Sequence, residues 1–536
     1  MPIFFPIFLY AETHYRFKYF FSFLKKREPE ILADLPHRLE PTAELPILLL
    51  VKDADHYPVE IMSVSISLRH ETTGRQFSQL ILTDSASVNE PLWWKVVHVP
   101  WDETFQKSFG AFFVDIYFEY KINNKLRRCK NDNYRTASKR SYCVFRSPDP
   151  LPSFPGWILG DTHTHSSYTN DQVEFGSPIG ASVELCKAMG LSFFCVTDHS
   201  YDLDDRIDNY LVNDPQLPKW KLQQNEIDEF NNSQDNFAVV RGEEVSVWNH
   251  ALHNVHLLLW GTRTFFHGSG DSAERWFHTN AEHTISDVLD KKEPATVAYA
   301  AHPAEPAPLL QRLFIGRGEW TLDDMRSTKL AGLQILNGET GIALEQGLSA
   351  WKKLLLEGKR IYIAAGNDAH GNFNRFKQIK IPFLKIIEAD KQLFGRMRTA
   401  VQCETISETT IVEALRSGRT VITNGPIVTF SIEKKNDIAK SLSTAQSLII
   451  RIKGISTNEF GAYNRSVVYV GKTGDAAEIA LWEIPLNDEY SFELNRAFDF
   501  SPSNIPHYFR IEAYTHNGAG INENGFCHTN PVWLEQ

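Results

Sequence analysis

Seven short apolar segments between residues 157 and 370 constrain this chain more than any other feature, because each carries metal-binding residue types at or near one end. Each segment has the length and composition of a β-strand, and helical patterns lie between several of them. In residues 177–190, for example, Ser177 can cap a helix, Pro178 suits its first turn and Gly190 ends it. Strands that alternate with helices over about 270 residues predict a parallel sheet or barrel.

The polar residues of the seven segments belong to the types that bind divalent ions. In chain order they are Asp161, His163 and His165; Asp198 and His199; Glu243 and Glu244; His253 and His256; His302; Asn337 and Glu339; and Asp368 and His370. In a parallel α/β barrel the carboxyl ends of the strands converge on one face, so these side chains are expected to meet there. Nitrogen and oxygen ligands without thiolates suit Zn²⁺, Mn²⁺ or Fe²⁺. Asn337 and Glu339 are expected to support ligands rather than bind directly.

Strand geometry limits which of these residues can point at one site. The two histidines of the HTH motif are two residues apart, so both face the same side of a strand and can hold one ion. Glu243 and Glu244 are adjacent and face opposite sides, so at most one of them should reach the site. His253 and His256 are three apart and also face opposite sides, which leaves one of them with a structural role.

β-rich sequence flanks this segment on both sides. In the run FFVDIYFEY, apolar residues from Phe112 to Tyr120 alternate with Asp115 and Glu119, as in a half-buried strand. The proline-rich stretch SPDPLPSFPG then forms a linker, and beyond residue 427 the two-residue period returns. We therefore expect a β-sandwich-like domain in residues 1–150, a central domain in residues 157–427 and a second β-sandwich-like domain in residues 428–536.

Composition and charge narrow the possible partners and location. The net charge is −11, which disfavours a general affinity for nucleic acid or for anionic membranes. The six cysteines are scattered without a CxxC pair, a pattern that suits a reducing, cytoplasmic location. The apolar N-terminus has no basic region before it and is expected to be structural rather than a signal peptide. Assembly into a homo-oligomer is compatible with the sequence.

Five short motifs, DTHTHS, VTDHS, GEE, AHP and NDAH, stand in an order that resembles the polymerase and histidinol phosphatase (PHP) superfamily of metal-dependent hydrolases. The resemblance covers about half the chain, residues 157–427. The segment EALRSGRTVITNGP, followed by a β-domain that ends in TNPVWL, is similar to the carbaryl-hydrolase-like (CehA/McbA) branch of that superfamily. The resemblance implies an α/β fold, a distorted seven-stranded (β/α)7 barrel flanked by the N-terminal and C-terminal β-sandwich domains.

The resemblance also implies two or three divalent ions as cofactors. The first ion would be held by His163, His165, Glu244 and Asp368; the second by Glu244, His256 and His302; and the third by His199, His370 and Asp171. Glu244 is preferred to Glu243, and His256 to His253, because these positions match the family's motifs. In the third site the family's usual acid position is occupied by Asn170, and Asp171 follows one residue later.

The expected function is that of a metal-dependent hydrolase acting on a small molecule, most simply a phosphoesterase. His199 or Asp368 would return a proton to the leaving group, and Arg375 and Arg419, which lie beside family motifs, would neutralise a phosphate. Cleavage of carboxyl esters or carbamates at the same site is an alternative. A second alternative is a metal-stabilised scaffold without activity, whose β-domains bind carbohydrate or a partner.

Overall fold

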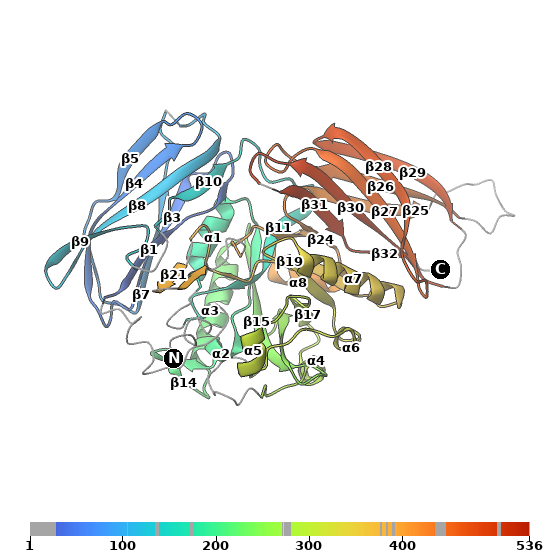
Figure 1. Cartoon of the computed structure of the whole chain (residues 1–536), viewed down its shortest axis with the longest axis horizontal. Coiled ribbons are helices and arrows are strands. Elements are labelled where there is room, and N and C mark those ends of the chain that lie inside the picture. Colours follow the sequence, from blue (N-terminus) through green and yellow to red (C-terminus); the bar gives the residue numbers. More distant parts are fainter. Residues whose placement is uncertain are drawn as a thin grey trace.

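The structure is a computed structural model that describes residues 28–103, 105–134, 139–170, 176–270, 272, 280–375, 378–381, 384–387, 392–434, 446–500, 505–521 and 523–534. The apolar N-terminal stretch and Asp171 lie outside these residues, so the expectations about them remain predictions. Two β-rich wings, the first blue and the second orange-red, stand on either side of a mixed central region (Figure 1). Among the described residues no helix is both long and apolar enough to cross a membrane.

The first wing consists of two sheets that pack across one apolar core. One sheet has the strand order β1-β3-β7 and the other β2-β10-β8-β4-β5, with β6 and β9 paired at its margins. The alternation predicted for Phe112 to Tyr120 is confirmed in β8, where every second side chain is buried. The strands are β1 (Glu30–Asp34), β2 (Arg38–Leu39), β3 (Leu45–Lys52), β4 (Val59–His70), β5 (Gln76–Leu82), β6 (Ala86–Val88), β7 (Leu92–Val99), β8 (Gly110–Ile122), β9 (Lys125–Lys130) and β10 (Tyr142–Arg146).

The central region contains eight helices among its described residues, together with the strands that carry the candidate site. Its strands are β11 (Trp157–His165), β12 (Phe193–Val196), β13 (Asp205–Arg206), β14 (Asn209–Asn213), β15 (Ala238–Trp248), β16 (Asn254–Trp260), β17 (Val297–Ala301), β18 (Gly332–Asn337), β19 (Tyr362–Gly366), β20 (Ala369–His370), β21 (Gln378–Ile381), β22 (Leu384–Ile387), β23 (Arg398–Gln402) and β24 (Thr420–Thr423). Its helices are α1 (Ile179–Ala188), α2 (Ser200–Leu203), α3 (Pro218–Ser233), α4 (Ile285–Lys291), α5 (Leu309–Phe314), α6 (Leu322–Met325), α7 (Ile342–Leu356) and α8 (Glu408–Ser417).

The helix predicted over residues 177–190 is confirmed as α1. Its apolar residues at helical spacing, Ile179, Val183, Cys186 and Met189, are buried, and Gly190 adopts the positive φ of 84° that ends many helices. One detail differs: Pro178 occupies the N-cap position, and Ser177 lies two residues before the first helical residue, Ile179.

The prediction of a (β/α)7 barrel is wrong. All seven predicted strands exist, but they belong to a 15-stranded mixed sheet of order β19-β18-β17-β16-β15-β12-β11-β23-β24-β31-β30-β27-β28. Strand β16 runs antiparallel to both β15 and β17, because only five residues connect Trp248 to Asn254 and no helix crosses between β15 and β16. At the other end, Trp157 to Gly160 of β11 pair antiparallel with β23, so no ladder between β11 and β19 closes a barrel among the described strands.

The second wing continues this sheet. β24 pairs with β31, and the strands β31-β30-β27-β28 pack against a three-stranded sheet of order β25-β26-β29. The predicted boundary at residue 428 therefore falls within a continuous hydrogen-bonded structure. The strands are β25 (Ile427–Lys434), β26 (Gln446–Ile455), β27 (Tyr463–Lys472), β28 (Ile479–Glu489), β29 (Ser491–Phe500), β30 (His507–Asn517), β31 (Asn524–Thr529) and β32 (Val532–Leu534).

Buried polar contacts join the two wings to the centre and to each other. The Arg38 guanidinium donates to both carboxylate oxygens of Glu459 in the second wing, each at 2.9 Å, and also pairs with Glu40. Asp34 accepts the backbone N–H groups of Phe373 and Asn374, each at 2.9 Å. These contacts connect the three parts of the chain directly.

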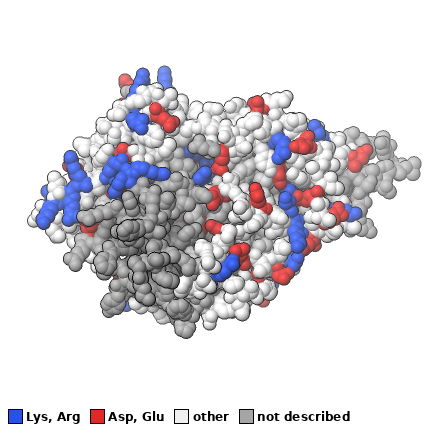
Figure 2. All heavy atoms as spheres, in the orientation of Figure 1, with Lys and Arg blue, Asp and Glu red and all other residues white. Residues whose placement is uncertain are grey.

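Charged side chains on the face shown in Figure 2 are interspersed, with basic ones gathered toward the left edge, the side on which Figure 1 places β9. β9 carries four exposed or half-buried basic residues. Three of them pair with acids: Arg127 with Glu28, Arg128 with Glu119, and Lys130 with Asp115 at 2.9 Å. These acids offset most of the positive charge of the strand.

A histidine between the first wing and the centre makes stability depend on pH. Desolvation of the partly buried ring and the charge of Arg398 lower the pKa of His37 from 6.5 to about 3. Between these pH values the unfolded chain binds a proton that the folded chain does not, so the free energy of unfolding falls as pH falls. The side chain of the His37→Gln variant is neutral at every pH. Between pH 7 and pH 5 we expect the free energy of unfolding of this variant to fall by up to about 2 kcal/mol less than that of the wild type. Urea unfolding at both pH values measures this difference, and equal losses would contradict the prediction.

Candidate metal centre

The end of β11 delivers the first two candidate ligands. His163 and His165 point to the same side of the strand, as predicted, and both are buried. Two contacts fix this end of the strand: Asp368 donates its backbone N–H to the His163 carbonyl at 2.8 Å, and the Thr164 hydroxyl donates to the Cys195 carbonyl at 2.8 Å. The HTH motif is therefore held between the start of β20 and the neighbouring strand β12.

The carboxylate of Glu244, on β15, lies at the middle of the cluster and contacts five imidazoles. Oε2 lies 3.1 Å from His163 Nε2, 3.4 Å from His165 Nε2 and 3.1 Å from His199 Nδ1, while Oε1 lies 2.6 Å from His256 Nδ1 and 3.3 Å from His302 Nε2. Each oxygen of Glu244 thus faces a different set of ring nitrogens. A carboxylate in this position can bridge two cations.

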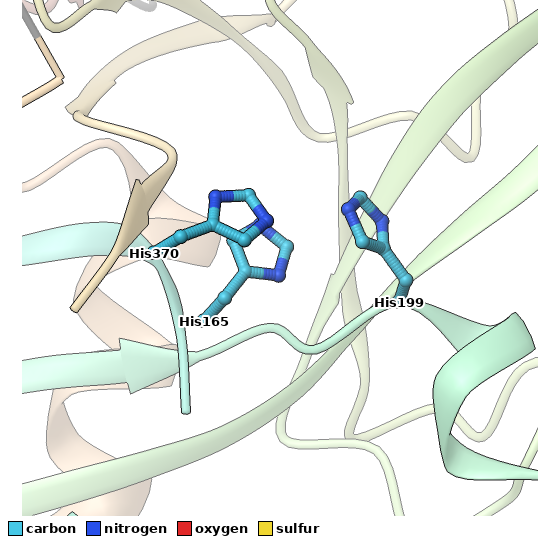
Figure 3. A group of neighbouring side chains, drawn as sticks. All are labelled: His165, His199 and His370. Atoms are coloured by element: carbon cyan, nitrogen blue, oxygen red, sulfur yellow. The ribbon is translucent and has the colours of Figure 1, made fainter. Parts of the chain in front are cut away.

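Three overlapping groups of ligand atoms are close enough to hold an ion each. They are His163, His165, Glu244 and Asp368; His199, Glu244 and His256; and His165, His199 and His370. In Figure 3 the rings of His165 and His370, from the ends of β11 and β20, lie together and face His199, which precedes α2. The His165 and His370 rings are stacked, with centroids 4.1 Å apart.

The structure largely reproduces the grouping that the resemblance implied, with two differences. In the third group His165 stands with His199 and His370, while the predicted Asp171 lies outside the described residues. The other difference is in the second group. The first group is the predicted one, and Asp368 Oδ1 lies 2.9 Å from His165 Nε2 and 3.4 Å from His163 Nε2. In the second group His199 takes the place expected for His302. His302 still reaches the same Glu244 oxygen as His256, and its ring stacks on that of His163 with centroids 5.8 Å apart.

The antiparallel direction of β16 explains how His256 reaches the cluster. His256 lies near the beginning of its strand, whereas the other candidate ligands lie in or just after the later part of theirs. Because β16 runs antiparallel to β15, its beginning lies beside the later half of that strand, where His256 pairs with Ser246, two residues from Glu244. The same ligand edge is thus assembled from strands of both directions.

Two ligands occupy backbone conformations that non-glycine residues seldom adopt. The φ angle is +29° at His302 and +52° at Asp368. Such conformations cost free energy and persist only where the surroundings enforce them. At Asp368 the enforcing contact is its N–H bond to His163, and at His302 it is the N–H bond to Gln334 Oε1 at 3.0 Å.

Other polar residues of the predicted strand ends form hydrogen bonds with the ligands or with residues next to them. Asp161 accepts the backbone N–H of His163 and two hydrogen bonds from Asn367, and burial raises the pKa of Asp161 to about 6. Asp198 accepts the backbone N–H and hydroxyl of Ser166, directly after the HTH motif, as well as the Gln223 amide. Both aspartates therefore fix the end of β11, which carries the histidines, and the residue that follows it.

Strand geometry left open which residue of each of two pairs reaches the cluster, Glu243 or Glu244 and His253 or His256. Glu243 points away from the cluster and accepts the Ser200 hydroxyl at 2.9 Å, and burial raises its pKa well above the ordinary value. His253 is half-buried in the loop before β16, where its N–H and carbonyl bond to Asn249. The structure therefore places Glu244 and His256 in the cluster, as preferred.

The two arginines predicted at the site are not brought to it. Arg375 is buried beside Asp34 of the first wing, close enough for its charge to act on the pKa of that carboxyl. Arg419 is exposed and stands next to Gln402, which pairs with Trp157 at the start of β11. His163 lies six residues further along that strand, about 20 Å away. Arg419 is therefore at the wrong edge of the sheet to act at the cluster.

Two residues that the sequence analysis missed contact the cluster. Gln334 lies with its side-chain oxygen 3.2 Å from His163 Nδ1, and its amide donates to Asn337 at 3.0 Å. Arg317 donates from a guanidinium nitrogen to His256 Nε2 at 2.8 Å. The signal for Gln334 was a polar residue inside the apolar run LAGLQILNGE, whereas Arg317 lies outside the seven segments and had no comparable signal.

Burial and mutual contact set the charges of the cluster. Burial alone would raise the pKa of Glu244, but the surrounding histidines, His256 and His163 foremost, hold it well below its usual range. Burial would lower the pKa of His165, but Asp368 and Glu244 raise it well above its usual range. Without ions, protons supply the positive charge that the two carboxylates require. Divalent cations would supply the same charge, and His199 offers a buried ring nitrogen, Nε2, that has no hydrogen-bond partner among the described residues.

No protein-family model matches the chain, and no curated protein matches it. Three solved structures show weak likeness. A β-D-mannosidase from Dictyoglomus thermophilum is 9% identical, with 95% of this chain and 67% of that chain covered and a TM-score of 0.22. A β-glucuronidase from Bacteroides uniformis is 8% identical, with 93% and 60% covered and a TM-score of 0.18. A Paenibacillus sp. cycloisomaltooligosaccharide glucanotransferase is 11% identical, with 94% and 71% covered and a TM-score of 0.18. Likeness this weak establishes neither a shared fold nor a shared activity.

Proposed function

We propose that this protein is a metal-dependent hydrolase that cleaves phosphoesters of small molecules at the cluster around Glu244. One observation carries the proposal: a single buried carboxylate lies within 3.4 Å of ring nitrogens from five histidines, with three on one oxygen and two on the other. Hydrogen bonding does not require such a set, and it has the composition of a site for two or three divalent ions such as zinc, manganese or iron.

The ions and the residues around them would contribute to hydrolysis in different ways. Bound ions would lower the pKa of a water molecule and stabilise negative charge that develops on the substrate. Glu244 would keep two ions at a fixed separation, and Gln334 would hold the His163 ring in its orientation. Gln392 donates to Asp368 Oδ2 at 3.3 Å while Oδ1 faces the histidines, so both oxygens of Asp368 are engaged.

His199 is therefore better placed than Asp368 to return a proton to a leaving group. Its ring stacks on Tyr201 with centroids 4.6 Å apart, which fixes its plane. Nδ1 lies 3.1 Å from Glu244 Oε2, whereas Nε2 has no hydrogen-bond partner among the described residues. In this role His199 would hold an ion through Nδ1, the nitrogen next to Glu244, and would keep the transferable proton on Nε2.

Metal content of the purified protein tests the proposal directly. We expect two to three equivalents of zinc, manganese or iron by plasma mass spectrometry, and a loss of at least one equivalent in the His163→Ala variant. The matched control is His253→Ala, because His253 lies outside the cluster and its removal should leave metal content unchanged. Chelation should abolish hydrolysis of the best substrate in a panel of phosphoesters, carboxyl esters and carbamates.

The same panel separates the alternatives. Hydrolysis of carboxyl esters or carbamates without phosphoesters would replace the proposed substrate class and keep the metal chemistry. Wild-type protein that neither contains nor takes up metal would overturn the proposal. Metal without activity on any member of the panel would favour a metal-stabilised scaffold.

A further inference from the structure

The most exposed large apolar side chains of the described residues gather in the central region. Four of them have exposed fractions of 66–71%, and they lie on the connections that follow β15, β17 and β18: Leu252, Leu309, Leu313 and Ile342. Single apolar side chains are common on protein surfaces, whereas a group of them around one site marks a surface that contacts something apolar.

These connections surround the candidate metal cluster, because they begin where its ligands lie. α5, which carries Leu309 and Leu313, comes after β17 and His302. The turn at residues 249–253 joins the ends of β15 and β16, and these strands carry Glu244 and His256. Exposed apolar area is therefore found on the same edge of the sheet as the ligands.

The hairpin of β13 and β14 adds to this area. It follows His199 and α2, and it carries Ile207 and Val212 with 60% and 44% exposed. In Figure 1, β14 and α5 lie toward the lower margin of the central region, below the two wings. We call the six side chains the apolar rim: Ile207, Val212, Leu252, Leu309, Leu313 and Ile342.

α5 directs its two leucines outward rather than into the cleft beside the cluster. Leu309 and Leu313 are one turn apart, so they share one face of the helix. Gln311 lies two positions from each of them and therefore faces the opposite way, where it lines the cleft together with His256 and His302. A small molecule inside the cleft would not reach the leucines, but a surface that covers the mouth of the cleft would contact them.

The turn before β16 presents Leu252 to solvent in an uncommon backbone conformation. Its φ angle is +58°, and 66% of the residue is exposed. The side-chain oxygen of Asn249 accepts the N–H groups of Ala251 and His253, each at 2.9 Å, and its amide donates to the Glu319 carbonyl in the cleft wall at 2.9 Å. Such a conformation costs free energy, and burial of the leucine does not compensate for that cost.

Charged residues on the same connections pair with each other. Arg206 donates two hydrogen bonds to Asp208 in the hairpin, each at 2.9 Å, and Arg312 of α5 donates to Glu319 at 2.9 Å. These pairs leave no net charge beside the apolar side chains, which favours a neutral surface as the partner. The net charge of −11 disfavours an anionic one.

The size of the rim favours a lipid surface over a second copy of the chain. A stable protein interface takes about 800 Å² from each partner. Six aliphatic side chains of roughly 100 Å² each, none of them fully exposed, supply less than that. Binding to a lipid surface has no such threshold, because its strength increases with each apolar side chain that is buried.

We infer that the apolar rim docks the mouth of the metal cluster onto a neutral lipid surface, and that the substrate is a phosphoester with an acyl chain taken from that surface. The substrate class rests on the proposed function. Docking itself does not require bound ions, so the two can be tested separately.

Flotation of the full chain with vesicles of dioleoyl phosphatidylcholine tests the docking. We expect the double variant Leu309→Gln, Leu313→Gln to bind roughly 10- to 100-fold more weakly than the wild type, because two apolar side chains are lost from the contact. The matched control is Leu126→Gln on β9 of the first wing, where 62% of the leucine is exposed, and its binding should be unchanged. Phosphatidylserine added to the vesicles should not strengthen the binding of the wild type.

Hydrolysis by the metal-loaded protein tests the substrate class. Two phosphoesters with the same headgroup are compared, one with long acyl chains in these vesicles and one with short chains in solution. We expect the double variant to lose at least about 10-fold on the vesicle substrate, and to keep its metal content and its rate on the soluble one.

The remaining outcomes separate docking from the proposed function. Equal vesicle binding by the wild type and the double variant, or none by the wild type, would overturn the inference, and hydrolysis of the soluble ester would then leave the proposed function intact. Binding lost only on removal of residues 1–27 would assign it to that segment and also overturn the inference. A wild-type dimer that dissociates in the double variant and does not bind vesicles would make the rim an interface between copies. Vesicle binding through the leucines without metal would support docking and overturn the proposed function together with the substrate class.

Discussion

Glutamine in place of Glu244 is expected to lower metal content by more than half and hydrolysis by at least about 100-fold. Replacing a residue that only orients a metal ligand typically lowers metal affinity or activity 10- to 100-fold. Replacing a carboxylate that contacts two groups of ligands should therefore lower them more. Glutamine keeps the size of the side chain but cannot offer two anionic oxygens to the five imidazoles around it. Plasma mass spectrometry and the rate on the best panel substrate measure the two effects.

The adjacent residue provides the matched control. Glu243→Gln is an identical chemical change on the same strand, but Glu243 points away and bonds to Ser200 and to the backbone of Phe266. Because burial raises the pKa of Glu243, its neutral form is favoured and a neutral amide should be tolerated there. We expect this variant to keep its metal. Equal metal loss in both variants would mean that Glu244 is not a specific ligand.

Alanine in place of Glu459 is expected to lower the free energy of unfolding by about 3–5 kcal/mol. The substitution would leave the guanidinium of Arg38 buried without the carboxylate that accepts two of its hydrogen bonds, and an unpaired buried charge is costly. The effect should be large because this pair joins the first wing to the second. Denaturant unfolding, followed by fluorescence, gives the change in midpoint.

Two further variants identify the cause of that loss. The exposed pair of Arg451 and Glu433, 3.1 Å apart with about half of each side chain exposed, should contribute less than about 1 kcal/mol when Glu433 is replaced by alanine. Combining Glu459→Leu with Arg38→Met should recover much of the lost stability, because the buried charge is then removed from both sides. No recovery in the double variant would assign the loss to packing rather than to charge.

The candidate site was more predictable from the sequence than the sheet that carries it. Ligand identity depends on residue type and on local alternation, and these placed His163 and His165 on one face and separated Glu244 from Glu243. Strand direction depends on contacts distant in sequence. The run LHNVHLLLWG places its histidine before the apolar residues, the reverse of the neighbouring runs, and this order is what an antiparallel strand requires. The prediction of a parallel barrel did not take that order of residues into account.

The predictions that Arg375 and Arg419 act at the site were wrong for a related reason. Arg419 stands beside a motif in sequence, but the strand that follows it runs from the opposite edge of the sheet, so proximity along the chain gave no information about distance in space. Arg375 follows Asp368 by only seven residues, yet the chain turns toward Asp34 between them. Arg317 reaches the cluster through a loop whose sequence, FIGRGEW, contains no periodic pattern.

The pairing of β24 with β31 sets an order of events during synthesis. Val421 and Thr529 are partners in the sheet but are separated by 108 residues, which a ribosome adds in roughly 5 to 20 s. Throughout that interval β24, with the sequence TVIT, has an unpaired apolar edge two strands away from the HTH motif. Asn530, which bonds to both Ile363 and Thr420, arrives last. We therefore expect a chain that stops before residue 524 to aggregate through the unpaired edge of β24.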